Sequence, residues 1–292
     1  MAAANQLKLF TTQRFLPLFI TQFLGAFNDN IFKNALIILI TFRIAEGLGL
    51  NAQLLVALAA GFFILPFFLF SATAGQLADR YEKSRMISVI KLFEVMLMAL
   101  AAIGFYLQST WFLMFVLFAL GVQAAFFGPL KYAILPEHLH ENELIAGNGL
   151  IEAGTFISIL LGTILGGALI LQKQGEYVIS AVIMLVALAG WCSSLFIPRT
   201  NTYPTKIKIN YNFISETKNL LVYAKQKRDV FLCILAISWF WLFGATFLSE
   251  LPVFAKDALH ADQRIVILFM TLFSIGLAIG SMICNKLGSR AK

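Results

Sequence analysis

The chain has 292 residues, of which 60% are hydrophobic and 13% are charged, and its mean hydropathy is +0.83. Soluble domains carry about 45–50% apolar and about 25% charged residues, so this composition excludes a water-soluble protein and indicates a membrane protein with several spans. The net charge of +7 does not indicate nucleic-acid binding, because the basic residues lie between apolar segments and do not form one patch.

Eight largely apolar segments each reach about 20 residues or more, the length that a helix needs to cross about 30 Å of hydrocarbon. Lipid offers no hydrogen-bond partner to free backbone groups, and the segments are too long for barrel strands, so we expect all of them to be helices. The predicted spans are residues 15–42, 54–77, 86–107, 111–130, 145–171, 177–197, 230–254 and 265–287.

The first predicted span carries Asn28, Asp29 and Asn30 near its centre. About 20 Å of helix lies on either side of Asp29, too far for its short side chain to reach water. One charge at a membrane helix centre costs about 2.5–3.5 kcal/mol, and such a residue normally marks a substrate, ion or proton path. The alternative is a structural pair with Lys33, four residues on. The two neighbouring asparagines favour a function, because a purely structural pair would not need them.

Residues 75–85, between the second and third predicted spans, read Gly-Gln-Leu-Ala-Asp-Arg-Tyr-Glu-Lys-Ser-Arg. A connection this charged is expected to lie in water at the membrane surface. Gly75 would permit close packing there, and Asp79 could accept hydrogen bonds from a neighbouring helix N-terminus or from Arg80 or Arg85. The physical pattern alone indicates a solvated turn with excess positive charge.

Further charged residues occur in or beside later spans. In the third span, Lys91 and Glu94 are three residues apart on one helix face, where an intrahelical pair is the simpler interpretation and a function the alternative. Lys131, at the end of the fourth span, can contact an anion or serve as an anchor at the membrane surface. Glu152 lies about two turns into the fifth span and is costly there unless it is paired or faces a cavity.

The sequence offers little for catalysis or metal binding. All three cysteines lie in apolar segments without a CxxC pair, so we expect small core residues and no disulfide; they are Cys192, Cys233 and Cys284. His138 and His140 have no further ligand nearby, so we expect no metal and no cofactor. No hydrophilic segment carries a catalytic motif, and we therefore expect no enzymatic activity.

The basic residues predict the orientation of the chain. With the N-terminus in the cytoplasm, sixteen Lys and Arg residues fall on the inner side and four on the outer side. Residues 199–229 form the one long hydrophilic connection, with seven basic and two acidic residues, and a surface helix is expected around Phe213–Gln226. We therefore predict a six-span bundle over residues 1–198, a basic cytoplasmic linker over 199–229 and a partial second bundle of two spans over 230–292.

Two sets of motifs resemble a known family. Residues 75–85 resemble the loop signature of the major facilitator superfamily, a Gly-x-Leu-Ala-Asp-Arg segment followed by spaced basic residues. Residues 23–30, 128–137 and 146–153 read Phe-Leu-Gly-Ala-Phe-Asn-Asp-Asn, Gly-Pro-Leu-Lys-Tyr-Ala-Ile-Leu-Pro-Glu and Ala-Gly-Asn-Gly-Leu-Ile-Glu-Ala. In that order they resemble the lysophospholipid transporter branch of the superfamily, best the forms fused to an acyltransferase and an acyl-carrier-protein synthetase.

The resemblance implies an all-α membrane protein with a major facilitator-type bundle: a complete N-terminal six-helix half and the first two helices of a second half. The family ordinarily has twelve spans, so the resemblance implies a C-terminally truncated or partial chain that we do not expect to transport by itself. It also implies a cytoplasmic latch, or gating loop, formed by Gly75, Asp79, Arg80, Lys83 and Arg85. The implied activity moves lysophospholipid from the outer to the inner leaflet.

The residues suit that substrate. Lys33 and Lys131 can contact its phosphate, and Asp29 and Glu152 can meet an ammonium head or a coupled cation, with Asn28 and Asn30 beside them. The leading hypothesis is a multi-pass transporter of the bacterial inner membrane whose partners are the bilayer, a lysophospholipid and a fused or associated acyltransferase. Two alternatives stay open: an exporter of amphipathic drugs or metabolites, and a membrane module of a fused phospholipid acyltransferase.

Overall fold

The computed structural model describes residues 6–40, 52–170, 172–199, 209–210 and 212–257, and single residues or short stretches at 259, 265, 268–269, 272–273, 275–277, 279–281 and 283. The chain divides into two compact units: residues 1–209 with 277–292, and residues 210–276. The described residues form helices and no strands, which confirms the all-α prediction.

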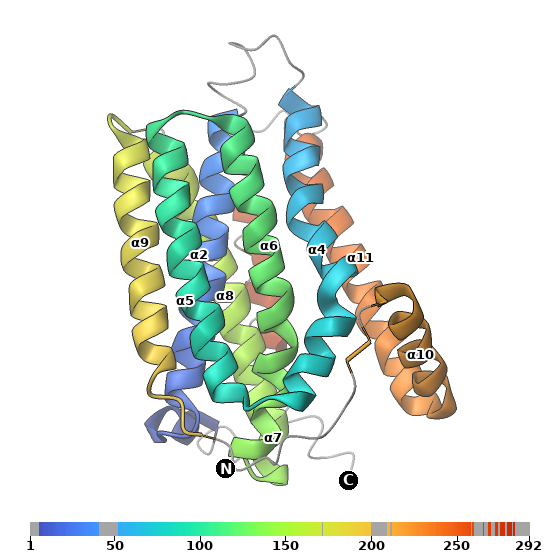
Figure 1. Cartoon of the computed structure of the whole chain (residues 1–292). Coiled ribbons are helices and arrows are strands. Elements are labelled where there is room, and N and C mark those ends of the chain that lie inside the picture. The colour runs from blue at the N-terminus through green and yellow to red at the C-terminus, as the bar shows by residue number, and fades with distance from the viewer. Residues whose placement is uncertain are drawn as a thin grey trace. The chain divides into compact units, whose positions relative to one another are not determined.

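The first unit contains six long helices (Figure 1). Their bounds are α2 (Leu16–Leu39), α4 (Ala52–Arg80), α5 (Lys83–Tyr106), α6 (Thr110–Ala133), α8 (Leu144–Ile170) and α9 (Gly175–Ser194). Three short helices lie before α2 and between α6 and α8: η1 (Lys8–Thr11), α7 (Leu135–His138) and η3 (Glu141–Glu143). The six long helices coincide with the first six predicted spans within a few residues at each end.

Five of the described helices are long and apolar enough to cross a membrane, those at Leu54–Arg80, Lys83–Tyr106, Thr110–His138, Glu141–Ile170 and Gly175–Ser194. α2 is not among them, because the polar residues around Asp29 lower its hydropathy. That α2 spans the membrane therefore stays a prediction. The protein is a multi-pass membrane protein. About half of the residues of the predicted span 265–287 are described, and those are helical.

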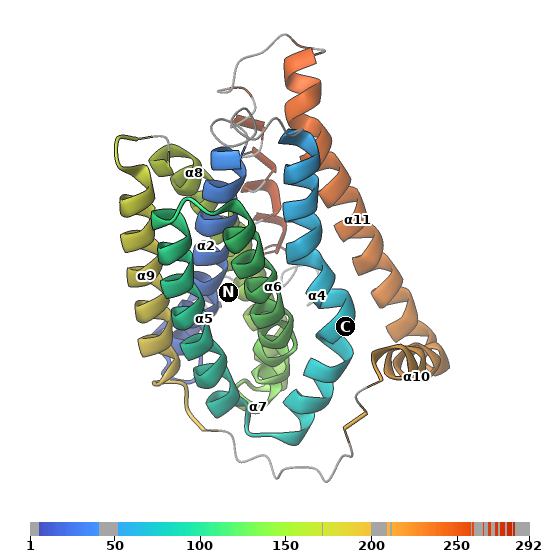
Figure 2. The ribbon, with the colours of Figure 1, turned by 45° about the horizontal axis from the view of Figure 1, so that its top comes forward.

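Helix α2 is the central element of the first unit. It packs most extensively against α8 and also against α9, while α4 packs against α6, and α5 packs against both α9 and α6. Figures 1 and 2 show α2 running between α5, α8 and α9. Leu36, Ile31 and Phe32 of α2 belong to the main hydrophobic core, which also takes in residues of α5, α6 and α9. The polar residues of α2 are thus placed inside a packed bundle.

Glycines let α8 approach the backbone of α2 closely. A β-carbon added at Gly162 would lie 2.6 Å from the carbonyl oxygen of Phe27, and one at Gly166 would lie 2.4 Å from that of Ile31. Both distances are shorter than any real carbon–oxygen contact of this kind, so only glycine fits. The two residues have the small-xxx-small spacing typical of helix pairs in membranes.

Ion pairs and hydrogen bonds join the elements at the end of the first unit where α2 begins. Arg14 forms two hydrogen bonds of 2.7 Å to the Glu143 carboxylate, and its guanidinium also donates to the carbonyl oxygen of His138. Lys83 pairs with Glu137 of α7 at 2.5 Å. The connection between α6 and α8 is therefore fixed both to the segment before α2 and to the start of α5.

The segment expected as a charged loop is mostly helical. Helix α4 continues to Arg80 and α5 begins at Lys83, so only Tyr81 and Glu82 lie in the turn. The Glu82 carboxylate accepts hydrogen bonds from the backbone N–H groups of Ser84 at 3.0 Å and Arg85 at 2.8 Å. This N-cap stabilises the first turn of α5 and allows the connection to be short. The two helices extend three residues beyond the predicted span ends at residues 77 and 86.

The second unit contains α10 (Phe213–Gln226) and α11 (Arg228–Asp257). Asn212 caps α10 by accepting a hydrogen bond from the Ser215 backbone N–H at 3.1 Å. The helix expected on the surface at Phe213–Gln226 is confirmed with those bounds, and α11 contains the predicted span 230–254.

The expectation that the cysteines are core residues was wrong for two of them. Cys192 of α9 and Cys233 of α11 are exposed on their helices, while Cys284 lies outside the described residues. Membrane helices are apolar on the faces that meet lipid as well as on those that meet other helices. An apolar sequence context therefore does not identify the core of such a protein.

Candidate functional site

The three consecutive polar residues of α2 point to different neighbours, because successive residues of a helix are about 100° apart. The Asn28 side-chain N–H₂ donates to Glu94 of α5 at 3.1 Å. Asn30 donates to the carbonyl oxygen of Ala26 in its own helix at 2.8 Å, and it lies beside Gly162 of α8. The predicted site residues Asn28 and Asn30 therefore lie at two different helix interfaces.

Asp29 has a partly exposed side chain between those two faces. Its Oδ1 atom is buried and has no hydrogen-bond partner among the described residues. Its carboxylate interacts electrostatically with the charges of Lys33, Lys131, Lys91 and Glu94. Asp29 is thus the point at which charged groups from α2, α5 and α6 meet.

Lys33 does not form the close structural pair that was the alternative for Asp29. Among the ion pairs within 4.0 Å formed by described residues, none joins these two side chains. The Lys33 ammonium instead lies over the ring of Phe63 in α4, 5.4 Å from the ring centre, as in a cation–π contact. The cation therefore bridges α2 to α4 while still acting electrostatically on Asp29.

Lys131 and Glu152 extend this group of charges across α6 and α8. The Lys131 ammonium lies 4.8 Å from the ring centre of Tyr132, and the Tyr132 hydroxyl donates a hydrogen bond to the Glu152 carboxylate. Lys131 interacts electrostatically with both Glu152 and Asp29. We call Asp29, Lys33, Lys131 and Glu152 the acid–lysine cluster. Two carboxylates and two ammonium groups there can receive a ligand that carries both signs of charge.

A second polar group, buried next to this cluster, was only partly foreseen. The intrahelical pair of Lys91 with Glu94 is present. In addition, Gln123 of α6 donates to Glu94 at 3.2 Å, and Asn28 of α2 donates to the other carboxylate oxygen. All four side chains are at most 3% exposed. We call these residues the Glu94 network. The sequence shows Asn28 and Gln123 as polar residues in apolar segments, but it does not reveal that both contact Glu94.

The residues expected to form the gating loop have different surroundings. Asp79 and Arg85 are exposed, Arg80 lies over the Tyr81 ring, and Lys83 is buried in its pair with Glu137. A β-carbon at Gly75 would meet nothing within 4 Å in the part of the chain that the structure describes. The close packing expected at Gly75 is therefore not found there.

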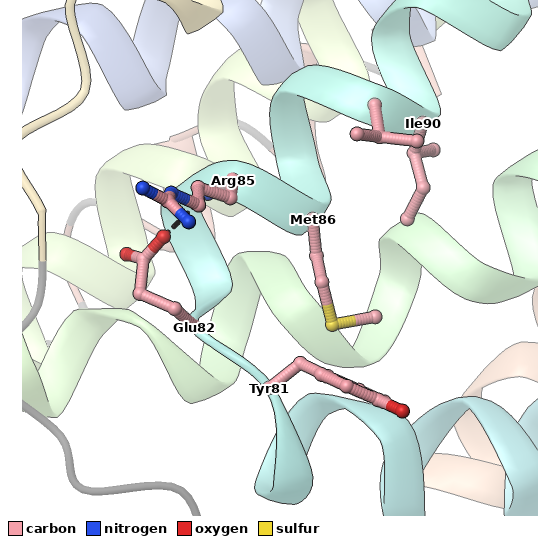
Figure 3. Close-up of a pocket in the computed structure, with 6 residues that line it drawn as sticks. Tyr81, Glu82, Arg85, Met86 and Ile90 are labelled. Carbon is pink, nitrogen blue, oxygen red and sulfur yellow. Dashed lines mark hydrogen bonds between the residues drawn. The ribbon is translucent and has the colours of Figure 1, made fainter.

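An open pocket of about 300 Å³ lies beside the α4–α5 turn. Figure 3 shows Glu82 and Arg85 together at one end of the pocket and Ile90 at the other. Its wall is mainly apolar and aromatic, with one exposed cation. The lining residues are Tyr81, Glu82, Arg85, Met86, Val89 and Ile90. None of them belongs to the acid–lysine cluster, so this pocket is not its entrance.

Comparison with known proteins gives a family and several named relatives. The sequence profile described as the Major Facilitator Superfamily matches residues 18–292. The Lysophospholipid transporter LplT of Serratia proteamaculans is 28% identical over 262 residues, which cover 89% of this chain and 62% of that protein. The protein of the same name from Pectobacterium carotovorum is 28% identical over 277 residues, 92% of this chain and 63% of the relative.

A third relative extends the similarity to another genus. The LplT of Salmonella newport is 31% identical over 185 residues, which are 63% of this chain and 42% of that protein. In each of these alignments the chain spans less than two thirds of the relative's length. The similarity to proteins named as lysophospholipid transporters is thus spread over most of the chain.

Proposed function

The chain belongs to the major facilitator superfamily, and we propose that it acts as a secondary transporter that moves lysophospholipid across the bacterial inner membrane by alternating access, rather than as an enzyme. The observation that carries this proposal is the acid–lysine cluster. It gathers four charged side chains from three helices of the bundle. The names of the relatives support the same substrate class.

The chemistry of the acid–lysine cluster matches a lysophospholipid head group. Such a head carries one phosphate and, in lysophosphatidylethanolamine, one ammonium group. Lys33 and Lys131 supply cations for the phosphate, and Asp29 and Glu152 supply carboxylates for the ammonium. Charge-assisted hydrogen bonds of this kind are the strong ones, and they are stronger where water is excluded. The free Oδ1 atom of Asp29 is an acceptor ready for a ligand donor.

We propose that the single acyl chain lies along a row of phenylalanine rings on α2. Neighbouring rings of Phe19, Phe23 and Phe27 are spaced by 6.0 and 6.3 Å, and each of these side chains is partly exposed. The row ends next to Asn28 and Asp29. A tail lying along these rings would remove apolar surface from water while the head reaches the charges.

Orientation and gating are part of the same proposal. The sixteen-to-four distribution of basic residues favours a cytoplasmic N-terminus and hence a cytoplasmic α4–α5 turn. In that orientation Gly75, Asp79, Arg80, Lys83 and Arg85 lie at the inner membrane surface. The resemblance of this segment to the family signature supports a gating role there.

Uptake by proteoliposomes tests the proposal. Protein expressed from its complete gene is reconstituted, and the entry of labelled lysophosphatidylethanolamine is measured. We expect Asp29→Asn, which keeps the shape of the side chain and removes its charge, to reduce uptake about tenfold or more. Loss of one partner of a buried charge contact costs about 2 kcal/mol or more.

A matched control is Glu141→Gln, which removes one carboxylate from an exposed position in η3. This variant is expected to retain uptake. Equal uptake by wild-type protein and Asp29→Asn would show that the acid–lysine cluster is not the binding site. Movement of a cationic dye without movement of lysolipid would favour the drug exporter, and acyl transfer by the purified protein would favour the acyltransferase module.

A further inference from the structure

The Glu94 network places a neutralised ion pair against Asn28, the residue that precedes Asp29 on α2. Glu94 receives hydrogen bonds from Asn28 and Gln123 and forms an ion pair with Lys91, so its carboxylate is satisfied from α2, α5 and α6. Asn28 and Asp29 are adjacent on α2. The network therefore determines the electrostatic surroundings of the carboxylate that the proposed transport function uses.

The Lys91 ammonium is confined next to α2. A β-carbon at Gly25 would lie 2.5 Å from the Lys91 Nζ atom, and one at Gly190 of α9 would lie 3.4 Å from its Cε atom. The Phe127 ring of α6 is centred 5.3 Å from Nζ. Because the side chain is fully buried, its charge cannot move out to water and must be neutralised by a nearby carboxylate.

Two carboxylates compete for that cation. Asp29 interacts electrostatically with Lys91, whose charge attracts it, and with Glu94, whose charge repels it. In a low-dielectric interior the two effects oppose each other, so a paired Lys91 exerts little net attraction on Asp29. Without the charge of Glu94, the unpaired ammonium would attract the Asp29 carboxylate.

We infer that Glu94 is a positioning residue: by engaging Lys91 and anchoring Asn28, it keeps the Asp29 carboxylate unpaired and available to the substrate. This inference rests on the proposed transport function for its consequence, although the pairing itself can be tested independently. Glu94 contacts Lys91, Asn28 and Gln123 and acts on the substrate only through Asp29.

The first experiment measures the state of Asp29 without transport. An apolar carbodiimide reacts with carboxyl groups that are not held in an ion pair, and mass spectrometry quantifies its adduct at Asp29. Glu94→Gln keeps the shape and an acceptor oxygen but removes the charge. We expect several-fold less adduct at Asp29 in Glu94→Gln than in the wild type. In the double variant Lys91→Met/Glu94→Gln, which removes the competing cation, the amount of adduct at Asp29 is expected to return to the wild-type level.

The second experiment uses the uptake assay. Glu94→Gln is expected to raise the KM for lysophosphatidylethanolamine about tenfold, since the substrate must displace Lys91 from Asp29, while the maximal rate changes less. The double variant is expected to return the KM to near the wild-type value. A residue needed only for packing would not be rescued by a second substitution in the same buried group.

The outcomes separate the two proposals. If Glu94→Gln lowers the labelling of Asp29 as expected but the wild-type protein moves no lysolipid, the transport function is contradicted and the role of Glu94 is still supported. Unchanged labelling and unchanged KM in Glu94→Gln would overturn the inference. If Glu94→Gln does not fold, Glu94→Ala takes its place, because it also leaves the Lys91 charge unpaired: labelling of Asp29 below the wild-type level supports the inference, and labelling at the wild-type level contradicts it.

Discussion

At the scale of single residues, two ion pairs at one end of the first unit differ in burial and should differ in strength. The side chains of Lys83 and Glu137 are 6% and 20% exposed, whereas those of Arg14 and Glu143 are 32% and 27% exposed. Water and salt screen an exposed pair, while loss of one member of a buried pair leaves a poorly solvated charge behind.

We therefore predict that Lys83→Met lowers the free energy of unfolding by about 1–3 kcal/mol. Glu143→Gln should lower it by about 0.2–1 kcal/mol, and by less at high salt. Unfolding of the purified protein in mixed detergent micelles, followed by circular dichroism, measures both. If the two variants lose equal free energy of unfolding, burial does not determine how much these ion pairs contribute to stability.

The residue scale is also where prediction from the sequence fell short. The spacing of Lys91 and Glu94 was enough to foresee their pairing, because residues three apart share a helix face. The bonds from Asn28 and Gln123 to Glu94 could not be foreseen. They join residues 66 and 29 positions apart, and depend on how α2 and α6 are rotated against α5. Periodicity within one helix carries no information on that rotation.

At the scale of elements, the close approach of α8 to α2 requires glycine at the points of contact. We predict that Gly166→Ala lowers the free energy of unfolding by about 1–3 kcal/mol, because its β-carbon would collide with the Ile31 backbone, which cannot rotate away. This loss should appear although alanine favours a helix over glycine by about 1 kcal/mol.

The neighbouring residue supplies the control. A β-carbon at Gly167 would be 3.8 Å from the nearest atom, Ile38 Cγ1, an ordinary contact. Gly167→Ala should therefore be neutral or slightly stabilising in the same unfolding measurement. If both variants lose stability equally, the close approach of α8 to α2 does not explain the glycines.

The helices themselves were well predicted, because length and apolarity suffice to identify a membrane helix. Helix α8 (Leu144–Ile170), for example, differs from its predicted span by one residue at each end. The largest error was at the end of α4, where charged residues suggested a loop. The cap provided by Glu82 lets two helices meet with two residues between them, and hydropathy does not detect such a cap.

At the scale of the whole molecule, the orientation in the membrane can be tested with cysteines. Arg85 and Gln108 are exposed near opposite ends of α5. In a background with Cys192, Cys233 and Cys284 replaced by serine, we predict that Gln108→Cys reacts with a membrane-impermeant maleimide in intact spheroplasts. Arg85→Cys should react only after permeabilisation. The reverse pattern would contradict a cytoplasmic N-terminus.

The confinement of Lys91 also restricts how this protein can evolve. Gly25 leaves the space that the Lys91 ammonium occupies. A mutation to alanine at position 25 would displace the ammonium from Glu94, whereas the same mutation is harmless once a shorter residue stands at position 91. We therefore expect positions 25 and 91 to change together: a side chain at position 25 is tolerated where residue 91 is shorter than lysine.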